Sequence, residues 1–193
     1  MLAITQRLLR LRQAGVTLVE LVIVLAILGV LAVAAAPSVV DRWQRDTVIL
    51  LAEQFASAAS LAQTMAQYQH LQTNLVPLDT QKGWAGGWKL TTSPAASDPD
   101  RTISNPQEET TFSISPPITQ AVRINWSAGA GLSYAPVGYS RRSNGGQLYG
   151  TLEISWGRHV RQVRINSVGR ARICNPTTDG NSCKPMGVDA PDP

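Results

Sequence analysis

One apolar run and an amphipathic stretch behind it organise the first third of the chain. Residues 16–36 are almost entirely aliphatic and contain a single charged residue, Glu20. As a helix rising about 1.5 Å per residue, this run would be roughly 30 Å long, which matches the hydrocarbon core of a bilayer. The pattern therefore predicts a membrane-spanning helix over 16–37, preceded by a leader over 1–15.

A second helical pattern follows Pro37. Apolar residues recur there at steps of three and four, the spacing of one face of a helix. They are Val48, Leu51, Phe55, Ala58, Ala62 and Met65. We expect this helix to run from about Ser38 to His70, within a segment over 38–72, and to pack its apolar face on a globular layer. Pro37 lacks a backbone donor and crowds the preceding turn, so we expect a bend near it.

The remainder of the chain, 73–193, reads as short strands between turn signals. The expected strands are Gly87–Thr92, Thr110–Ser115, Ala121–Trp126, Leu132–Tyr139, Tyr149–Trp156 and Val160–Ile173, the last being two strands or one strand with a bulge at Gly169. Stretches 93–107 and 140–147 are rich in turn formers and predict loops, the second a hairpin tip. The expected fold class is α+β, a long N-terminal helix packed on an antiparallel sheet domain.

Charge is distributed unevenly along the chain, whose formal net charge is +4. Three arginines belong to the leader, so its removal would leave +1. Between residues 123 and 172, by contrast, there are eight arginines and one carboxylate, Glu153. Such a block indicates an anionic partner, although solvated strand faces also collect arginines.

Cys174 and Cys183 are the two cysteines of the chain. Both follow the apolar run, and in an oxidising compartment beyond the membrane we expect them to form a disulfide that closes a loop of about ten residues. A zinc site would need more ligands than this region offers, so no metal is expected. His70 and His159 have no partner at a catalytic spacing, and we therefore expect neither an enzyme nor a cofactor.

Two further groups raise the question of a ligand. The carboxylates of the 93–109 region lack the regular spacing of a calcium loop, so we expect a solvated acidic loop there; they are Asp98, Asp100, Glu108 and Glu109. Trp126 and Trp156 fit apolar strand faces. Trp84 and Trp88, in Gly-Trp-Ala-Gly-Gly-Trp, remain open between a core and a ligand contact.

The stretch Gly15-Val16-Thr17-Leu18-Val19-Glu20 joins the basic leader to the apolar run. A charged residue inside a membrane span costs roughly 2.5–3.5 kcal/mol, so Glu20 needs a partner. The stretch resembles the leader and first helix of type IV pilins and pseudopilins, in which a prepilin peptidase cuts after the glycine and methylates the new N-terminus. The resemblance implies cleavage between Gly15 and Val16. It also makes Glu20 the fifth mature residue, which in that family is held to pair with a neighbouring pilin subunit during assembly.

Pro37 also stands where that family usually has a proline, whereas Val16 replaces the commoner phenylalanine. Two simpler hypotheses fit the same apolar run. An ordinary secretory signal would be cut at Ala34-Ala35-Ala36, but its leader would be unusually long and would contain an acid. A plain membrane anchor is compatible with the resemblance, because the pilin helix lies in the inner membrane before assembly and in the filament core afterwards.

The segment Gly169-Arg170-Ala171-Arg172 precedes Cys174. Two-residue spacing places Arg170 and Arg172 on one face of an extended strand, and Gly169 permits the bend that presents them. Guanidinium groups match phosphate oxygens, so the pair forms a phosphate clamp on this interpretation. A solvated strand face accounts for the same two arginines without a ligand.

A sheet domain behind a pilin helix, ending in Gly-Arg-Ala-Arg before a cysteine, is similar to the GspH/FimT group of minor pilins and pseudopilins. In FimT-like members a Gly-Arg-x-Arg motif is associated with binding DNA for natural transformation. The resemblance maps that motif onto Gly169, Arg170 and Arg172. Charge alone adds the remaining arginines of the expected DNA-binding set, which are Arg141, Arg142, Arg158, Arg161 and Arg164.

The sequence thus predicts a minor type IV pilin that binds extracellular DNA for uptake. We expect it to cross the bacterial inner membrane once, with a periplasmic C-terminal domain, and then to join a pilus at the cell surface. The alternative is a GspH-like minor pseudopilin of a type II secretion filament. A third interpretation is a pilus-assembly or adhesion subunit without a nucleic-acid partner. The minor pilin and the pseudopilin share the same fold and leader, so neither feature distinguishes these two hypotheses.

Overall fold

A computed structural model describes residues 16–93, 110–118, 121–142, 146–180 and 183–184. The chain forms two compact units, Met1–Asp41 and Arg42–Pro193. Helix α1 (Leu18–Gln69) passes from the first unit into the second. The expected leader over 1–15 and most of the expected 93–107 loop lie outside the described residues.

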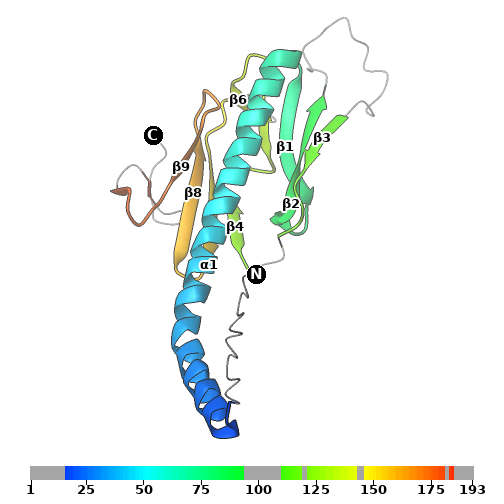
Figure 1. Cartoon of the computed structure of the whole chain (residues 1–193). Helices are drawn as coiled ribbons and strands as arrows, with labels where there is room; N and C mark the ends of the chain where they lie inside the picture. Colours follow the sequence, from blue (N-terminus) through cyan, green and yellow to red (C-terminus); the bar gives the residue numbers. More distant parts are fainter. Residues whose placement is uncertain (1–15, 94–109, 119–120, 143–145, 181–182, 185–193) are drawn as a thin grey trace, which may run out of the picture. The chain divides into compact units, whose positions relative to one another are not determined.

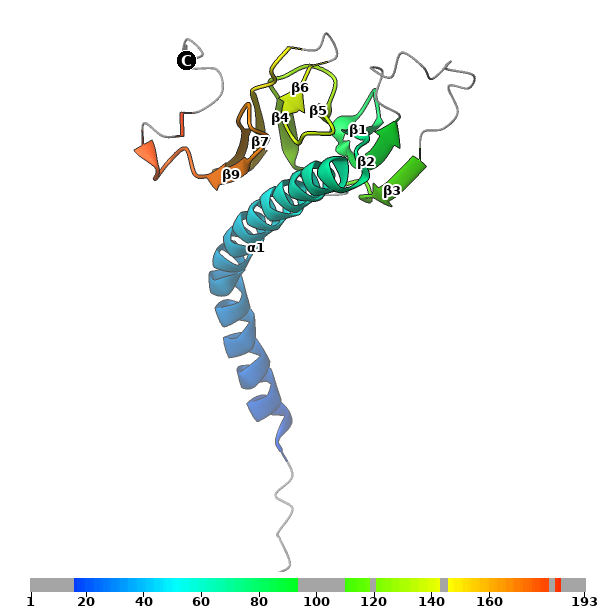
Figure 2. The ribbon, with the colours of Figure 1, turned by 90° about the horizontal axis from the view of Figure 1, so that it is seen from above.

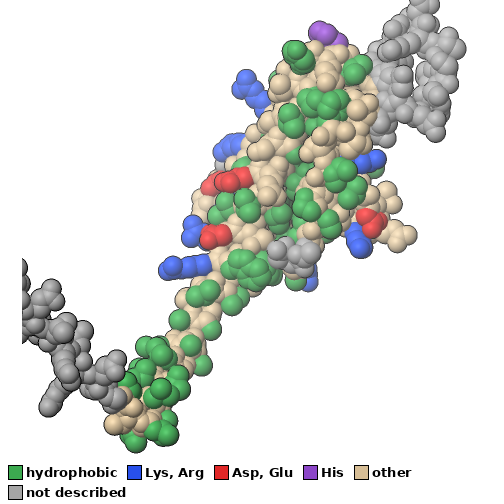
Figure 3. Space-filling view, turned by 45° about the vertical axis from the view of Figure 1, so that its right-hand side comes forward, with side chains coloured by type: hydrophobic (Ala, Val, Ile, Leu, Met, Phe, Trp, Pro, Cys, Tyr) green, Lys and Arg blue, Asp and Glu red, His purple; other side chains and the backbone are tan. Residues whose placement is uncertain are grey.

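In the first unit, α1 starts with a capped turn and continues as an apolar helix. The hydroxyl of Thr17 accepts a hydrogen bond from the Glu20 N–H at 3.2 Å, which is the geometry of a helix N-cap. The large aliphatic side chains from Val16 to Val33 are 49–80% exposed, and Figure 3 shows this part of the helix covered by hydrophobic side chains. They therefore lie outside the core of their own chain.

Within the described residues, no one straight helix is both long and apolar enough to cross a membrane. The segments Leu18–Val33 and Ala35–Gln69 meet those two criteria only as a pair, joined at a bend of 40°. The break directly follows Val33, the residue whose carbonyl would accept a helical hydrogen bond from position 37 if that residue had an N–H. Pro37 itself stays inside α1.

In the second unit, α1 lies against two sheets (Figures 1 and 2). Its buried side chains recur at helical spacing; they are Val48, Leu51, Ala52, Phe55, Ala59, Ala62 and Ala66. The predicted apolar face is confirmed, with Ala58 and Met65 at its margin. The helix ends at Gln69, and His70 adopts a positive φ of 55°, the left-handed conformation that commonly ends a helix.

The strands form two antiparallel sheets, so the predicted α+β fold class is confirmed. The five-stranded sheet has the order β3-β2-β1-β5-β6 and the four-stranded sheet the order β4-β7-β8-β9. The bounds of the first are β1 Gln72–Asp79, β2 Gly83–Ser93, β3 Thr110–Ile114, β5 Leu132–Tyr134 and β6 Ser140–Arg141. Those of the second are β4 Arg123–Trp126, β7 Gly150–Trp156, β8 His159–Ile165 and β9 Ala171–Cys174.

Strand β1 was missed in the sequence because Pro77 and Asp79 are unusual in strands. Thr73 and Leu75 are buried and pair with β5 as well as with β2. Pro77 pairs with Trp88 of β2 but lies beyond the part of β1 that faces β5. A proline is tolerated at such an edge position, where its missing donor breaks no ladder.

The remaining differences concern strand length. The predicted strand Leu132–Tyr139 was too long: β5 ends at Tyr134, and the chain turns back through Gly138, which has φ 90°. β2 begins at Gly83 rather than Gly87. Residues 140 and 141 of the predicted 140–147 loop form β6, and the described ends of the expected hairpin tip are joined by a hydrogen bond from the Arg142 N–H to the Gly146 carbonyl at 2.9 Å.

An aromatic cluster joins α1 to both sheets. Phe55 contacts Trp84 and Trp88 of β2 edge to face, with ring centroids 5.2 and 5.6 Å apart, and lies 6.2 Å from Trp126 of β4. Trp84 and Trp88 are 5% and 4% exposed. These two tryptophans therefore belong to the core, which resolves the question left open by the sequence.

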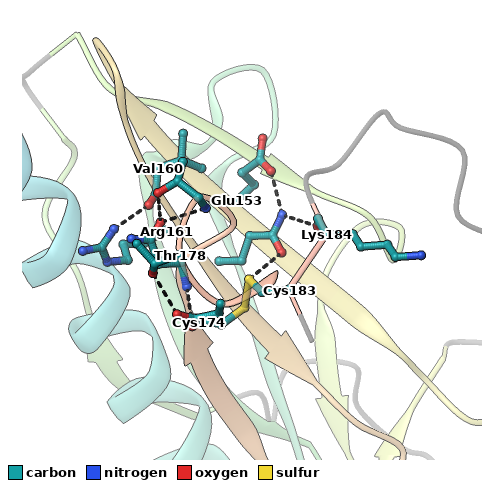
Figure 4. The surroundings of a disulfide bond; sticks show 11 residues. Glu153, Val160, Arg161, Cys174, Thr178, Cys183 and Lys184 are labelled. Carbon is teal, nitrogen blue, oxygen red and sulfur yellow. Dashed lines mark hydrogen bonds between the residues drawn. A yellow bond between two sulfur atoms is a disulfide. The ribbon is translucent and has the colours of Figure 1, made fainter. Parts of the chain in front are cut away.

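The predicted disulfide between Cys174 and Cys183 is confirmed, with their Cα atoms 6.0 Å apart. It holds the loop after β9 against the sheet (Figure 4). Beside it, the fully buried side chain of Gln162 donates to the Glu153 carboxylate at 2.8 Å and to the Lys184 carbonyl at 2.9 Å. One side-chain amide thus ties the disulfide loop to β7 and β8.

Candidate nucleic-acid interface

The turn between β8 and β9 carries Arg170 and is held by its own hydrogen bonds. The Asn166 side chain accepts from the Arg170 N–H at 2.9 Å, and the Asn166 carbonyl accepts from the Gly169 N–H at 2.8 Å. Asparagine is favoured in turns because its side chain can replace a backbone acceptor in this way. Arg170 is exposed at the end of this closed turn.

Gly169 is buried in the same turn, in a place that no other residue fits. Its φ is +89°, which L side chains rarely adopt, and a Cβ there would lie 2.6 Å from the Gly138 carbonyl oxygen and 2.7 Å from the Tyr134 ring. The structure therefore gives Gly169 no surface for DNA. It lets the turn approach its neighbours, and so positions the two arginines that follow.

Side chains from three more segments hold the turn. The Gln63 amide on α1 donates both to the Val168 carbonyl and to the Gly138 carbonyl, each at 2.9 Å. The Tyr134 hydroxyl donates to the Gly169 carbonyl at 3.1 Å, and burial raises the pKa of this phenol. The Ser140 hydroxyl lies 2.8 Å from the Asn166 carbonyl oxygen. The turn is thus fastened to α1, β5 and β6.

Arg164 and Arg172 lie directly opposite one another on β8 and β9. Both point to the outer face of the sheet, because Val163 and Ile165 are buried on the other face. Opposite residues of an antiparallel pair have Cβ atoms about 4.5–5.5 Å apart, and like charges there destabilise the sheet. An anion bound between the two guanidinium groups would offset that repulsion.

The remaining arginines of the predicted set fall into two places. Arg141 and Arg142 follow Ser140, which contacts the turn, and both are exposed. Arg170 lies one residue before β9, so the prediction that it shares an extended strand with Arg172 was wrong, although the two remain neighbours. We call Arg141, Arg142, Arg164, Arg170 and Arg172 the arginine patch.

Arg158 and Arg161 lie apart from the arginine patch. Arg158 is in the β7–β8 turn, six residues and therefore about 20 Å of strand from Arg164. Arg161 is half-buried on the same strand face as Val163, and its guanidinium donates to the Val160 carbonyl at 2.8 Å. The structure does not bring these two residues to the β8–β9 turn.

Two carboxylates border the arginine patch. Glu153 accepts the bond from Gln162, and Asp179 lies in the disulfide loop. The Asn175 N–H and the Thr178 hydroxyl lower the pKa of Asp179, and the charges of Arg172 and Arg161 lower it further. Asp179 is therefore ionised at neutral pH. Five arginines against two carboxylates leave the patch positive.

The residues that hold the turn were missed in the sequence, for a reason common to all of them. Gln63 is not one of the apolar positions of the helix pattern, and its amide reaches backbone atoms 75 and 105 residues away. Tyr134 and Ser140 gave no signal beyond their place in or near a strand. Only Asn166, three residues before a glycine, carries a local turn signature.

Among the described residues, no group of three or more His, Cys, Asp or Glu side chains could hold a metal ion. The carboxylates expected to form a solvated acidic loop lie outside the described residues. Glu20, the predicted assembly residue, is exposed in the first turn of α1, where the helix dipole favours a negative charge. Gly15 of the predicted cleavage site is outside the described residues, and Val16 is exposed.

Comparison with known protein families identifies the family of this chain. Residues 10–36 match the prokaryotic N-terminal methylation motif. Residues 51–169, more than half of the chain, match the family of the type II transport protein GspH. The chain belongs to the GspH family. The match ends at Gly169, so Arg170 and Arg172 come directly after it.

The fold agrees with this assignment. The crystal structure of the type IV minor pilin FimU from Pseudomonas aeruginosa strain PAO1 is similar, with a TM-score of 0.50 and 14% sequence identity over 69% of this chain and 92% of that chain. None of the curated proteins matches the sequence. With its methylation motif, this GspH-family chain is a minor pilin or pseudopilin of the GspH/FimT type, in a class of structural filament subunits.

Proposed function

We propose that this GspH-family protein is a minor type IV pilin that binds extracellular DNA through its arginine patch for uptake in natural transformation. One observation carries the proposal: Arg164 and Arg172 face one another across β8 and β9, beside a turn that α1 and β5 hold in place. Like charges directly opposite each other on paired strands are unfavourable, and an anion bound beside both arginines would offset part of that repulsion.

The chemistry of the patch fits a phosphate backbone. Guanidinium groups donate in a planar fork that matches phosphate oxygens, and a fixed turn loses little conformational freedom when it binds. Contacts of this kind position a protein on DNA without reading its sequence. We therefore expect weak binding to duplex DNA with little sequence preference.

Salt dependence tests the proposal. The mature full-length protein in non-ionic detergent should bind a labelled duplex, and its affinity should fall with salt by a log-log slope of about 0.9 per phosphate neutralised. The double variant Arg170→Gln/Arg172→Gln keeps polarity but removes two charges. Its slope should be smaller by about 1.8 units, by similar amounts for unrelated sequences.

Matched variants locate the interface. Arg45→Gln removes one exposed arginine from α1 and should leave the slope unchanged. Arg158→Gln should also leave it unchanged, because that residue lies about 20 Å of strand from Arg164. All variants must retain the melting temperature of the wild type. A double variant that binds like wild type at low salt would remove the arginine patch from the interface.

Processing, assembly and location complete the proposal. We infer cleavage after Gly15 by a prepilin peptidase, pairing of Glu20 with a neighbouring subunit, and residence in the inner membrane before assembly into the pilus. The exposed aliphatic side chains of α1 and the methylation motif over 10–36 support all three. The same exposed side chains and methylation motif are equally compatible with a pseudopilin.

The GspH match also supports a second function, a minor pseudopilin in a type II secretion filament. Deletion of the gene separates the two in cells. A minor pilin for DNA uptake should lose transformation and keep protein secretion, whereas a pseudopilin should lose secretion. Complementation with Arg170→Gln/Arg172→Gln should fail in the first case and succeed in the second.

A further inference from the structure

We propose that Tyr149 and the arginine patch together form a binding surface for single-stranded DNA, in which the tyrosine ring stacks on an unpaired base. The inference rests on the proposed DNA-binding function and names the form of DNA that fits the site best. It assigns a role to an exposed aromatic side chain that neither the charge pattern nor the Gly-Arg-Ala-Arg segment includes.

Tyr149 lies on the same sheet face as the paired arginines. It directly precedes β7, whose Leu152 is buried, and Leu148 on its other side is 1% exposed. Alternation therefore places Tyr149 and Thr151 on the outer face, and the tyrosine side chain is 50% exposed. About half of this aromatic side chain is therefore accessible to a ligand on that face.

The register of the sheet brings the ring close to the guanidinium groups. Thr151 pairs with Arg164, and Arg164 pairs with Arg172. Tyr149 is two residues from Thr151, so it is the diagonal neighbour of Arg164. Diagonal neighbours are about 7–8 Å apart, within reach of an aromatic and a long side chain.

A hydrogen bond on the other side orients the ring. The Tyr149 hydroxyl donates to the Gln147 side-chain oxygen at 3.1 Å, and Gln147 forms a backbone bridge with Arg141. The hydroxyl end of the ring thus lies at Gln147, the residue that pairs with Arg141. Tyr139 is a second exposed aromatic residue, next to the Gly138 that touches the turn.

This combination of side chains favours unpaired bases. Proteins that bind single strands join a positive surface for the phosphates to aromatic rings on which bases stack. In a duplex the base faces are covered by their neighbours, so a ring on a flat strand face gains no stacking there. Phosphate contacts alone would hold both forms, and the ring would add affinity only for the single strand.

The test compares two probes on the mature full-length protein in detergent. One probe is a labelled oligothymidine of about 20 nucleotides, and the other a blunt duplex of the same length. Fluorescence anisotropy should show tighter binding to oligothymidine. Tyr149→Leu should weaken oligothymidine binding at least about fivefold and change duplex binding less than twofold.

Two control variants separate stacking from other effects. Tyr149→Phe keeps the ring and loses the hydroxyl, so it should retain most of the preference for the single strand. Arg170→Gln/Arg172→Gln should weaken both probes. The melting temperature of each variant, compared with wild type, checks the fold.

The outcomes distinguish this inference from the function on which it rests. Equal or tighter binding of the duplex, or equal loss of both probes in Tyr149→Leu, would overturn the stacking role and leave DNA binding in place. Tyr149→Phe behaving like Tyr149→Leu would show that the hydroxyl contact, not the ring, matters. Failure of wild type to bind either probe would remove both proposals.

Discussion

Gly169 and Arg170 are neighbours in the chain with opposite environments. Gly169 is buried against the Gly138 carbonyl, whereas Arg170 is exposed and its backbone is fixed by the Asn166 side chain. A Gly-Arg-x-Arg segment therefore combines a packing requirement with two charges. The two charges and their spacing could be predicted from the sequence. The contacts of Gln63 and Tyr134, which make the glycine necessary, could not be predicted, because contacts between residues far apart in the chain leave no local sequence pattern.

Replacing Gly169 by alanine should destabilise the protein by about 2–4 kcal/mol, since the side chain adds both a strained positive φ and a clash with backbone. Gly129 is the matched control: its φ is +87°, and a Cβ there would meet nothing within 4 Å. Gly129→Ala should therefore cost only the conformational part, about 1–2 kcal/mol. Urea unfolding of both variants measures the difference. Equal losses would mean that crowding at Gly169 is unimportant.

At the scale of elements, the β8–β9 hairpin carries three of the five arginines of the arginine patch, Arg164, Arg170 and Arg172. β9 has only four residues and lies at the sheet edge, so its few ladder bonds are supplemented by the disulfide that follows it. The alternation of apolar and polar residues predicts both strands, and the glycine at 169 predicts the break between them. The cysteine pairing follows from the oxidising compartment in which the domain is expected. β1 could not be predicted, because pairing with strands on either side outweighs the low strand propensity of Pro77.

Loss of the disulfide should loosen this hairpin. Closing a loop of this length stabilises by about 3 kcal/mol in the chain-entropy model, so Cys183→Ser should lower the melting temperature by roughly 5–10 °C. Reductant should lower the melting temperature of wild type by a similar amount and leave the variant unchanged. Alkylation of unreduced wild type, followed by mass measurement, should find no free thiol. Two alkylated cysteines would contradict the pairing.

On the scale of the whole molecule, one helix serves two environments. The part of α1 in the first unit exposes aliphatic side chains, and the part in the second unit buries one face against two sheets. The apolar run and its change to an amphipathic pattern after Pro37 predicted this division, because each environment selects its own periodicity. Which filament the molecule joins is not encoded in that pattern.

Processing is the whole-molecule property most open to a direct test. Gly15→Leu should block the peptidase and leave a full-length precursor in the inner membrane, because cleavage follows a glycine in this class. Wild type extracted from membranes should begin at Val16 by N-terminal sequencing. Gly29→Ala, within the apolar helix, should be processed normally, since a Cβ there meets nothing within 4 Å. A mature N-terminus at Pro37 would instead indicate an ordinary secretory signal.

The two hydrogen bonds from Gln63 have a mechanical consequence. The bond to the Val168 carbonyl links α1, the element by which pilins pack into filaments, to the turn that carries Arg170, so tension applied there reaches the helix in one step. The bond to the Gly138 carbonyl joins α1 to the chain between β5 and β6. A pull on Arg172 acts on β9 instead, whose last residue, Cys174, is held by the disulfide to Cys183. In the proposed function, DNA pulled by a retracting filament would load the Gln63–Val168 hydrogen bond and the Cys174–Cys183 disulfide as well as the short ladder of the edge strand β9.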